Sequence, residues 1–476
     1  MVSKTKRVLA LVLTAMISAS ALAGCGGGSS GGGSTTTSTP TNSTANNTAS
    51  NSGNQAAELD LDSDSSVDII KERIKKEAET SGGEIKLEVW CSGDDKKFET
   101  TRIKAFKDKY TPDGVKIVVN ISAVGEDKVG GKVLEKPEEA ADVFNFADDQ
   151  LTGLAESKAI ADLGDMFQNN IKKNNTEESV SVCSVNDVFY AFPRTSDNGY
   201  FMYYDKRDLD EADLDDMDTI ISKLGAKNKN IYLPLGNAWY NCGFFFAAGC
   251  DISYDAKTKQ QTATFNTPEG YKAARAMNHL ALNLHKGFEC DAGSLGDNVF
   301  VADGFKNGTL GAAVIGTWAG PDIKKNIGAE YVGAAKLPKV DMDGEKVQLH
   351  SFSGYKIVGV NKFTKYPITS KVLAYFLTNK ESQLERYKTR GLIPTNKEAL
   401  EDSDVKADPA LKAIQDQKEF SHPQGASVGT SFWSCSPGTI GTKIKDAEGN
   451  LPEDKIEEIL NSVVAQIESS NKSNAT

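Results

Sequence analysis

A strand–helix–strand pattern at the start of the folded part of this chain constrains its fold most strongly. Residues 85–90 (Ile-Lys-Leu-Glu-Val-Trp) alternate apolar and polar side chains as a strand does, and residues 98–110 have helical spacing. Residues 115–119 (Val-Lys-Ile-Val-Val) then form a second strand. Because two strands joined through a helix by short connections form a βαβ unit, the pattern predicts a parallel sheet and an α/β fold.

The same alternation of strands and helices recurs along the chain. A strand at residues 142–146 is followed by a helix at 151–157. A helix at 268–285 has clear end signals, since Thr267 can cap its start and Gly287 can end it. Further strands are predicted at 310–315 and 355–360, and further helices at 68–80, 366–378 and 455–469.

The first 25 residues have the three regions of an export signal. Basic side chains lie among the first seven residues, and residues 8–21 form an apolar run that is too short to span a membrane comfortably. Small residues then lead to Leu-Ala-Gly-Cys at 22–25, which resembles the lipobox of bacterial lipoproteins. The resemblance implies that residues 1–24 are a signal peptide and that the thiol of Cys25 is acylated.

The alternative for this segment is an ordinary secretory signal that is cut after a small residue, with Cys25 incidental. Either reading predicts an exported protein whose body works outside the cytoplasm. With the lipid, we expect the chain on the extracellular face of a bacterial cell membrane, in a Gram-positive organism.

A low-complexity tract follows Cys25. Residues 26–57 are almost entirely Gly, Ser, Thr, Asn and Ala, and none of them can seed a core. A coil of ~30 such residues has a root-mean-square reach of about 30 Å. Residues 25–66 are therefore predicted to be the lipidated cysteine and a disordered tether, and residues 67–83 an N-terminal helix before the main fold.

Length and charge limit the number of domains and the kinds of partner of the remaining part of the chain. About 400 residues are too many for one compact core and are typical of two domains. The net charge of −12 argues against a nucleic-acid partner, which is usually bound by a basic patch. It also argues against electrostatic attraction to anionic lipid, so the acyl chains would supply the membrane anchor.

The chain shows few residue patterns that support catalysis. Its four histidines include no pair at a metal-chelating spacing on one helix face. The six cysteines other than Cys25 have no Cys-x-x-Cys spacing, so free thiols and disulfides both remain open. A pair of catalytic carboxylates also remains open, because its signature is a separation in space. We predict a protein that is not an enzyme and that has no cofactor and no metal.

The four tryptophans are more informative. Trp90 ends the first strand, whereas Trp239, Trp318 and Trp433 lie in segments rich in Gly, Asn and Ser. Ligands of α/β sheets bind beyond the carboxyl ends of strands, and flat aromatic faces beside polar side chains suit the apolar faces of pyranose rings. We predict that the last three tryptophans contact a sugar. The alternative for each is core packing, which we favour for Trp90.

Several segments follow one another in the order of a known family. They include residues 141–151 (Ala-Asp-Val-Phe-Asn-Phe-Ala-Asp-Asp-Gln-Leu), 190–206, 316–338, 351–361 and 391–396 (Gly-Leu-Ile-Pro-Thr-Asn). Together they resemble extracellular solute-binding proteins of ABC sugar importers, of the maltose/maltodextrin-binding type. The resemblance implies a type II binding-protein fold, in which two α/β lobes, each a mainly parallel sheet flanked by helices, enclose a ligand cleft.

The resemblance also implies candidate ligand contacts, position by position. Acids that match the family's site would accept hydrogen bonds from sugar hydroxyls rather than catalyse. Asp95 stands where the family often has a lysine, and Asn198 stands where it can carry an acid. The candidate ligand-binding residues are Asp94, Asp95, Phe146, Asp149, Asn198, Trp239, Tyr240, Trp318 and Trp433.

The function that the resemblance implies is capture of a malto-oligosaccharide, an α-1,4-glucan, by a monomeric lipoprotein that delivers it to ABC permease subunits. The first lobe would take residues 84–195 and 350–400, and the second lobe residues 196–349 and 401–470. One alternative is the same fold with a different oligosaccharide, a polyol or a phosphorylated sugar. The other is a surface enzyme that degrades glycans.

Overall fold

The computed structural model describes residues 61, 63–255, 257–429 and 432–470, which belong to one compact unit. The predicted signal peptide, the predicted lipidation site Cys25 and nearly all of the predicted tether lie outside the described residues. No helix of the described part of the chain is long and apolar enough to cross a membrane.

The first sheet contains the predicted βαβ unit. Strand β1 (Glu84–Cys91) pairs in parallel with β2 (Lys116–Ala123), and α2 (Lys96–Tyr110) joins the two. β1 also pairs in parallel with β3 (Val143–Ala147). The order of the sheet is β2-β1-β3-β17-β6, in which β17 (Lys356–Val360) is antiparallel to both β3 and β6 (Ala191–Thr195).

The second sheet repeats this arrangement, and its order is β11-β8-β12-β7-β13. β8 is parallel to β11 and β12, whereas β7 is antiparallel to β12 and β13. The strands are β7 (Phe201–Asp205), β8 (Asn230–Tyr232), β11 (Phe288–Glu289), β12 (Leu310–Ile315) and β13 (Val332–Ala335).

One reversed strand stands in each otherwise parallel sheet because of how the chain crosses between the sheets. The first crossing is residues 196–200, between the end of β6 and the start of β7. The second crossing passes through β16 (Ser351–Ser353) directly before β17. A strand that follows such a crossing enters its sheet at the carboxyl edge of the parallel strands, so it runs against them. The prediction of mainly parallel sheets is therefore confirmed, with β17 and β7 as the exceptions.

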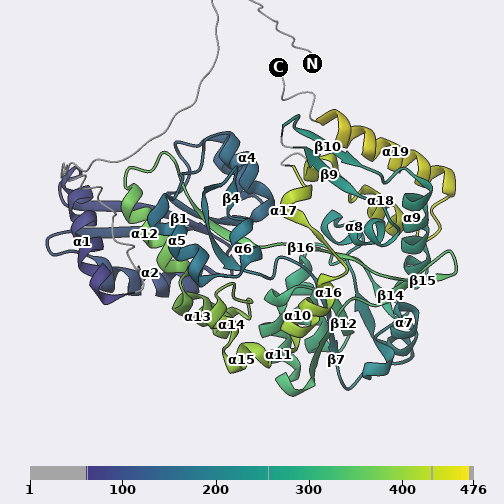
Figure 1. Ribbon diagram of the computed structural model, residues 1–476. Coiled ribbons are helices and arrows are strands. Elements are labelled where there is room, and N and C mark those ends of the chain that lie inside the picture. The colour runs from purple at the N-terminus through teal and green to yellow at the C-terminus, as the bar shows by residue number, and fades with distance from the viewer. Residues whose placement is uncertain (1–60, 62, 256, 430–431, 471–476) are drawn as a thin grey trace, which may run out of the picture. The chain divides into compact units, whose positions relative to one another are not determined.

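Helices flank both sheets (Figure 1). Those in the segments of the first sheet are α1 (Asp64–Glu79), α3 (Val129–Glu135), α4 (Leu151–Glu156), α5 (Asp165–Asn174), α6 (Glu177–Ser181), α12 (Pro367–Thr378) and α13 (Lys380–Arg390). Those in the later segments are α7 (Met217–Ala226), α8 (Ala238–Ala247), α9 (Pro268–Ala281), α10 (Asp297–Asn307), α11 (Gly320–Ile327), α14 (Lys397–Leu400), α15 (Ser403–Lys406), α16 (Pro409–Lys418), α17 (Gln424–Ser427), α18 (Thr439–Asp446) and α19 (Glu453–Ser470).

The remaining strands are short and lie outside the two sheets. They are β4 (Ser184–Val185), β5 (Val188–Phe189), β9 (Ile252–Asp255), β10 (Gln260–Ala263), β14 (Lys339–Met342), β15 (Glu345–Gln348) and β18 (Ser421–Pro423). The last of these pairs in parallel with β16, which ties the second crossing to the segment after α16.

Separate apolar cores support the two sheets. Buried apolar side chains of residues 61–192 and 357–377 form one cluster. Those of residues 200–352, 410–413 and 428–467 form two further clusters around the second sheet. This division supports two lobes, while the lobe boundaries drawn from the sequence remain a prediction.

The predicted elements are present, with differences at their ends. The helix predicted at 268–285 ends at Ala281, and the positive φ angles of His285 (57°) and Gly287 (113°) exclude a helix through these residues. Thr267 does cap its start, by accepting a hydrogen bond from the backbone N–H of Gly270. The choice left open for the cysteines is narrowed as well, since the thiols of Cys91, Cys183, Cys242, Cys250 and Cys290 are free and buried.

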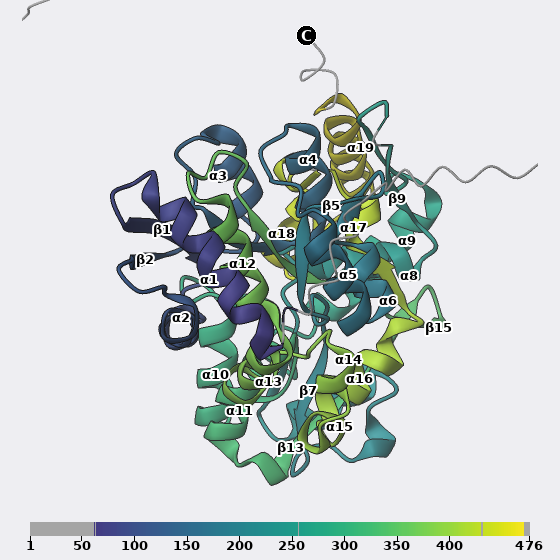
Figure 2. The ribbon, with the colours of Figure 1, turned by 60° about the vertical axis from the view of Figure 1, so that its left-hand side comes forward.

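Helix α1 packs into the core around the first sheet and is not a separate element before it. It begins at Asp64, inside the segment predicted as tether. Ile70, Ile74 and Ala78 on one face of this helix are almost fully buried, so the helix packs against the core. It lies beside α12 in both views (Figures 1 and 2).

A carboxylate of α1 caps that neighbouring helix. Glu77 accepts hydrogen bonds from the backbone N–H groups of Ile368 at 2.8 Å and Thr369 at 2.9 Å. The residue before α12, Tyr366, supplies no side-chain cap of its own. Glu77 therefore satisfies donors that a helix start leaves open and places a negative charge at the positive end of the helix dipole.

We expect Glu77→Ala to lower the free energy of unfolding by about 1–2 kcal/mol, the usual cost of a lost helix cap. Urea denaturation followed by circular dichroism measures this. Glu79→Ala, an exposed residue of the same helix, is the matched control and should unfold as the unaltered protein does. Equal effects of the two substitutions would contradict the capping role.

Candidate functional site

A cavity of about 490 Å³ lies where the two crossings bring the sheets together. Its lining comes from the turns after β2, β3 and β12, from the first crossing, from the starts of β17, α8 and α17, and from the 3-10 helix η5 (Phe432–Cys435). The lining residues are Glu126, Asp127, Ala147, Asp149, Gln150, Asn198, Asn237, Ala238, Trp239, Trp318, Lys356, Gln424 and Trp433. We call it the tryptophan cavity.

The three tryptophans of this cavity are held in place by their ring nitrogens. The Nε1 groups of Trp239 and Trp433 donate to Gln424 Oε1 at 2.8 Å and to Asp149 Oδ2 at 3.1 Å. Nε1 of Trp318 donates to Asn298 at 2.8 Å. All three rings are half-buried, and the centroids of Trp239 and Trp318 lie 5.8 Å apart. With each N–H engaged, the rings offer their faces as contact surface.

Asp149 supplies an acceptor beside these rings. It follows β3 on the 3-10 helix η1 (Asp148–Gln150) and is 7% exposed. Its Oδ1 atom has no hydrogen-bond partner among the described residues. Burial raises the pKa of Asp149, and hydrogen bonds from Trp433 and Gln424 oppose that rise. Asp149 thus links the Trp433 ring to the edge of the first sheet.

Lysine and arginine side chains balance the acids at the first sheet's edge. Nζ of Lys356 lies 2.6 Å from Glu126 Oε2 and 5.2 Å from the centroid of the Trp318 ring. Nη1 of Arg194 lies 2.7 Å from the other oxygen of Glu126, and Nη2 of Arg194 pairs with Asp95. Burial lowers the pKa of the Arg194 guanidinium. The network orients Glu126 and Lys356 toward the cavity.

Five of the nine predicted ligand residues line this cavity together: Asp149, Asn198, Trp239, Trp318 and Trp433. Two predicted aromatics lie outside the lining. Phe146 is fully buried and packs against Phe144 at a centroid distance of 5.5 Å, because β3 is covered on both faces. Tyr240 is also buried, with its centroid 5.1 Å from Trp239, so it supports that ring from behind.

Asp94 and Asp95 also lie outside the lining. Asp95 is 1% exposed, and its two oxygens are taken by Arg194 and by Nε of Arg390 at 2.9 Å. Asp94 has a largely exposed side chain that lies 3.5 Å from Arg390. Because both oxygens of buried Asp95 are engaged by these arginines, its role here is to neutralise their guanidinium groups.

Sequence reasoning missed six polar residues of the lining: Glu126, Asp127, Gln150, Asn237, Lys356 and Gln424. Position could have indicated three of them, since Glu126 and Gln150 follow strands and Lys356 begins one at the same edge. No feature of the sequence around Gln424 indicates that it lines the cavity. It reaches the cavity because β18 pairs with the crossing strand β16.

Comparisons with known proteins agree with this architecture. Residues 101–413, more than half of the chain, match the family model described as bacterial extracellular solute-binding protein. A solved structure with acarbose is 28% identical, with a TM-score of 0.72 over 82% of this chain and 100% of that chain. The ligand-free maltodextrin binding protein MalE1 from L. casei BL23 is 24% identical, with a TM-score of 0.64 over 81% of this chain and 99% of that chain.

A curated relative matches over a shorter stretch. The galactooligosaccharide-binding protein of Bacillus subtilis (strain 168) is 31% identical over 119 residues, which are 25% of this chain and 27% of that protein. The chain thus spans about a quarter of the length of the curated relative it matches. With the solved structures, the comparisons confirm the two-lobed α/β fold and the family resemblance.

We expect Arg194→Ala to destabilise the protein by about 3–5 kcal/mol, because it leaves the buried carboxylates of Asp95 and Glu126 without their shared partner. Guanidinium chloride denaturation measures the loss. Arg275→Ala is the control, since this arginine pairs with half-exposed Asp343 and Glu453 and its loss should cost about 1 kcal/mol or less. Similar losses in the two variants would contradict the burial argument.

Proposed function

Because this chain belongs to the bacterial extracellular solute-binding proteins, we propose that it captures a malto-oligosaccharide in the tryptophan cavity and delivers it to an ABC importer. The observation that carries the proposal is the cavity lining itself. Three oriented tryptophans surround one space together with a buried carboxylate whose Oδ1 atom has no partner among the described residues.

The lining matches the chemistry of a sugar. A pyranose has apolar C–H faces, which stack on indole rings, and an equatorial ring of hydroxyls, which need both donors and acceptors. Acceptors are available on Asp149 and Glu126, and donors on Lys356, Asn198 and Gln424. A volume of about 490 Å³ lies within the usual range for small-molecule sites, roughly 300–1,000 Å³.

The placement of the tryptophans supports closure around the ligand. Asp149 and Lys356 belong to the first sheet's edge, whereas Trp239 and Trp318 belong to segments of the second sheet. A sugar between them would make contacts that exist only when the lobes close. The importer's permease subunits would then distinguish the loaded protein from the empty one.

The proposed sugar is supported by comparison with relatives. The structure that is 28% identical carries acarbose, and the L. casei relative is a maltodextrin binding protein, which together favour an α-1,4-glucan. The curated relative is named for galactooligosaccharides and favours the alternative of a different glycan in the same fold. Membership of an extracellular family places the protein outside the cytoplasm, and we propose Cys25 as its lipid anchor and the monomer as its working form.

Isothermal titration of the purified protein against a sugar panel tests the proposal. The panel contains maltose, maltotriose, longer malto-oligosaccharides, galacto-, xylo- and cello-oligosaccharides, and monosaccharides. Tight binding of α-1,4-glucans, with no product after long incubation, is the expected result. Preference for another glycan would overturn the substrate, and product formation would overturn the binding role in favour of an enzyme.

Replacing Trp433 by Ala should weaken sugar binding by about 1–3 kcal/mol, the value of one stacked, largely buried aromatic contact. Trp90→Ala is the matched control, because this half-buried tryptophan of β1 lies outside the cavity lining. Titration of both variants with the best ligand of the panel measures the difference. Unchanged affinity in a folded Trp433→Ala protein would remove this ring from the site.

A further inference from the structure

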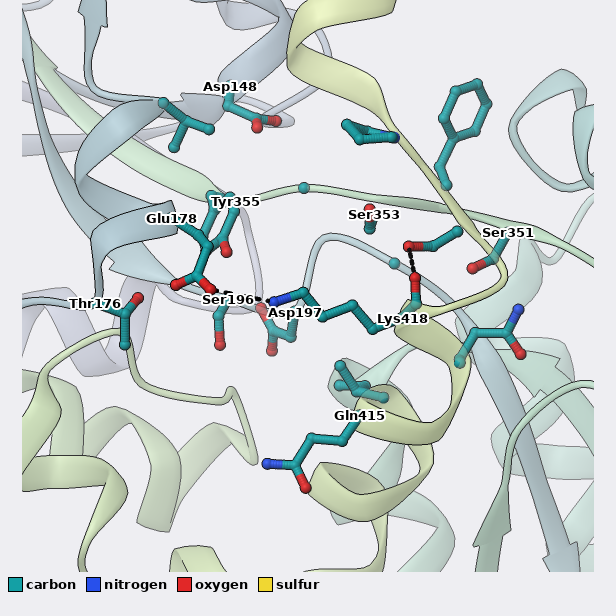
Figure 3. A pocket seen from close by; sticks show the side chains of 18 of the residues that line it. Asp148, Thr176, Glu178, Ser196, Asp197, Ser351, Ser353, Tyr355, Gln415 and Lys418 are labelled. Carbon is teal, nitrogen blue, oxygen red and sulfur yellow. Dashed lines mark hydrogen bonds and ion pairs between the residues drawn. The ribbon is translucent and has the colours of Figure 1, made fainter. Parts of the chain in front are cut away.

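A second cavity, of about 500 Å³, lies against both crossings (Figure 3). The second crossing contributes residues 351–355 to its lining, and helices α6 and α16 contribute from either side. Figure 3 shows Asp148 at this lining, apart from Asp197 and Lys418. We call this space the crossing cavity. None of its lining residues belongs to the tryptophan cavity.

Two short elements, η1 and α17, contribute to both cavities. On η1, Asp148 lines the crossing cavity and Asp149 lines the tryptophan cavity. On α17, Gly425 lines the crossing cavity and Gln424 lines the tryptophan cavity. The two elements lie against each other, since a Cβ atom added at Gly425 would lie 2.9 Å from Oδ2 of Asp148. This close approach brings Gln424 to the side of Asp149.

The side chain of Gln424 joins three separate parts of the tryptophan cavity. Its Oε1 atom accepts a hydrogen bond from Nε1 of Trp239 on α8 at 2.8 Å, and a longer one from Nδ2 of Asn198 in the first crossing at 3.4 Å. Its amide also hydrogen-bonds the carboxylate of Asp149 on η1. Gln424 is 4% exposed, so water has little access to replace these partners.

The carboxylate of Asp149 extends this set of hydrogen bonds to a second tryptophan. Its Oδ2 atom accepts from Nε1 of Trp433 at 3.1 Å. Burial raises the pKa of Asp149, whereas the hydrogen bonds from Trp433 and then Gln424 act to lower it. Hydrogen bonds therefore run from the indole of Trp239 through Gln424 and Asp149 to the indole of Trp433.

A glutamine amide suits this place because its two neighbours have opposite needs. The indole N–H of Trp239 needs an acceptor, and the carboxylate of Asp149 needs a donor, and one amide group supplies both. A glutamate would instead place a second negative charge beside Asp149. A methionine has a similar size, but it would leave the indole and the carboxylate without this partner.

We propose that Gln424 is a positioning residue of the sugar site, which fixes the indole of Trp239 relative to that of Trp433 through the carboxylate of Asp149. The proposal rests on the proposed function, since it takes these two rings as sugar contacts. Asp149 follows a strand of the first sheet, whereas both tryptophans pack against the core of the second sheet. The amide of Gln424 thus also joins the two lobes at the site.

Gln424→Met removes both hydrogen-bonding groups and should weaken binding of the best sugar of the panel by about tenfold or more. Isothermal titration measures this affinity. Near-ultraviolet circular dichroism of the sugar-free protein reports the surroundings of the indoles and should change as well. Gln260→Met, an exposed residue of β10 outside the cavity lining, is the matched control and should leave both measurements unchanged.

Gln424→Glu separates positioning from packing, because its effect should depend on pH. At about pH 8 the introduced carboxylate can only accept hydrogen bonds, so the affinity should fall as in Gln424→Met. The charge of Asp149 raises the pKa of the new carboxyl, and at about pH 5 its protonated form again offers a donor to Asp149 and an acceptor to Trp239. The affinity should recover by about tenfold, whereas Gln424→Met should show no recovery.

Other titratable groups around position 424 are present in the unaltered protein as well, so the ratio of the two affinities at each pH isolates the new carboxyl. These groups are Asp148 and Asp149 on η1, Glu126 and Asp127 after β2, Lys356 at the start of β17, and His422 on β18.

Unchanged sugar affinity in folded Gln424→Met, or an equal loss at both pH values in Gln424→Glu, would overturn the positioning role. If Gln424→Met fails to fold, Gln424→Asn takes its place, because it keeps the amide but is one methylene too short to reach both neighbours. A protein that binds no sugar of the panel would overturn the proposed function, and circular dichroism of the sugar-free variants would still test the positioning role. Sugar binding by variants with unchanged affinity and unchanged circular dichroism would overturn the positioning role alone.

Discussion

The close contact between the two crossings is the constraint on which the rest of the structure depends. The backbone N–H of Asn198 donates to the carbonyl oxygen of Gly354 at 3.3 Å. A Cβ atom added at Gly199 would lie 2.9 Å from the carbonyl oxygen of Phe352, so a larger residue there would push the crossings apart. This contact brings the carboxyl edges of both sheets to one place, and both cavities form there.

The same edge carries charges that a purely structural core would avoid. Asp148 and Asp149 are buried, and burial raises the pKa of each. Arg194 is fully buried and shared between Asp95 and Glu126. Replacing such groups by well-packed apolar side chains is often neutral or stabilising. Their presence at a cavity edge is therefore expected of a binding surface, where an incomplete hydrogen-bond set is completed by the ligand.

Whether a predicted ligand residue lines the tryptophan cavity depends on the range of the interactions that place it. Trp239, Trp318 and Trp433 line the cavity, and their turn-forming, polar neighbours are a local signal. Phe146 lies outside the lining because its strand is buried on both faces, which depends on helices far away in the chain. Asp95 lies outside it as well, and Arg194, 99 residues away, pairs with its carboxylate.

The sequence by itself determined the βαβ units, the amphipathic helices and the aromatic residues that end up beside one cavity, because these depend on spacing over a few residues. Only the tertiary structure decided that β7 and β17 run against their sheets, and that Gln424 and Lys356 meet the tryptophans. It also decided that consecutive acids on η1 line different cavities. These features depend on where the chain crosses between the sheets. Contacts between residues that are far apart in the chain produce no periodic pattern in the sequence.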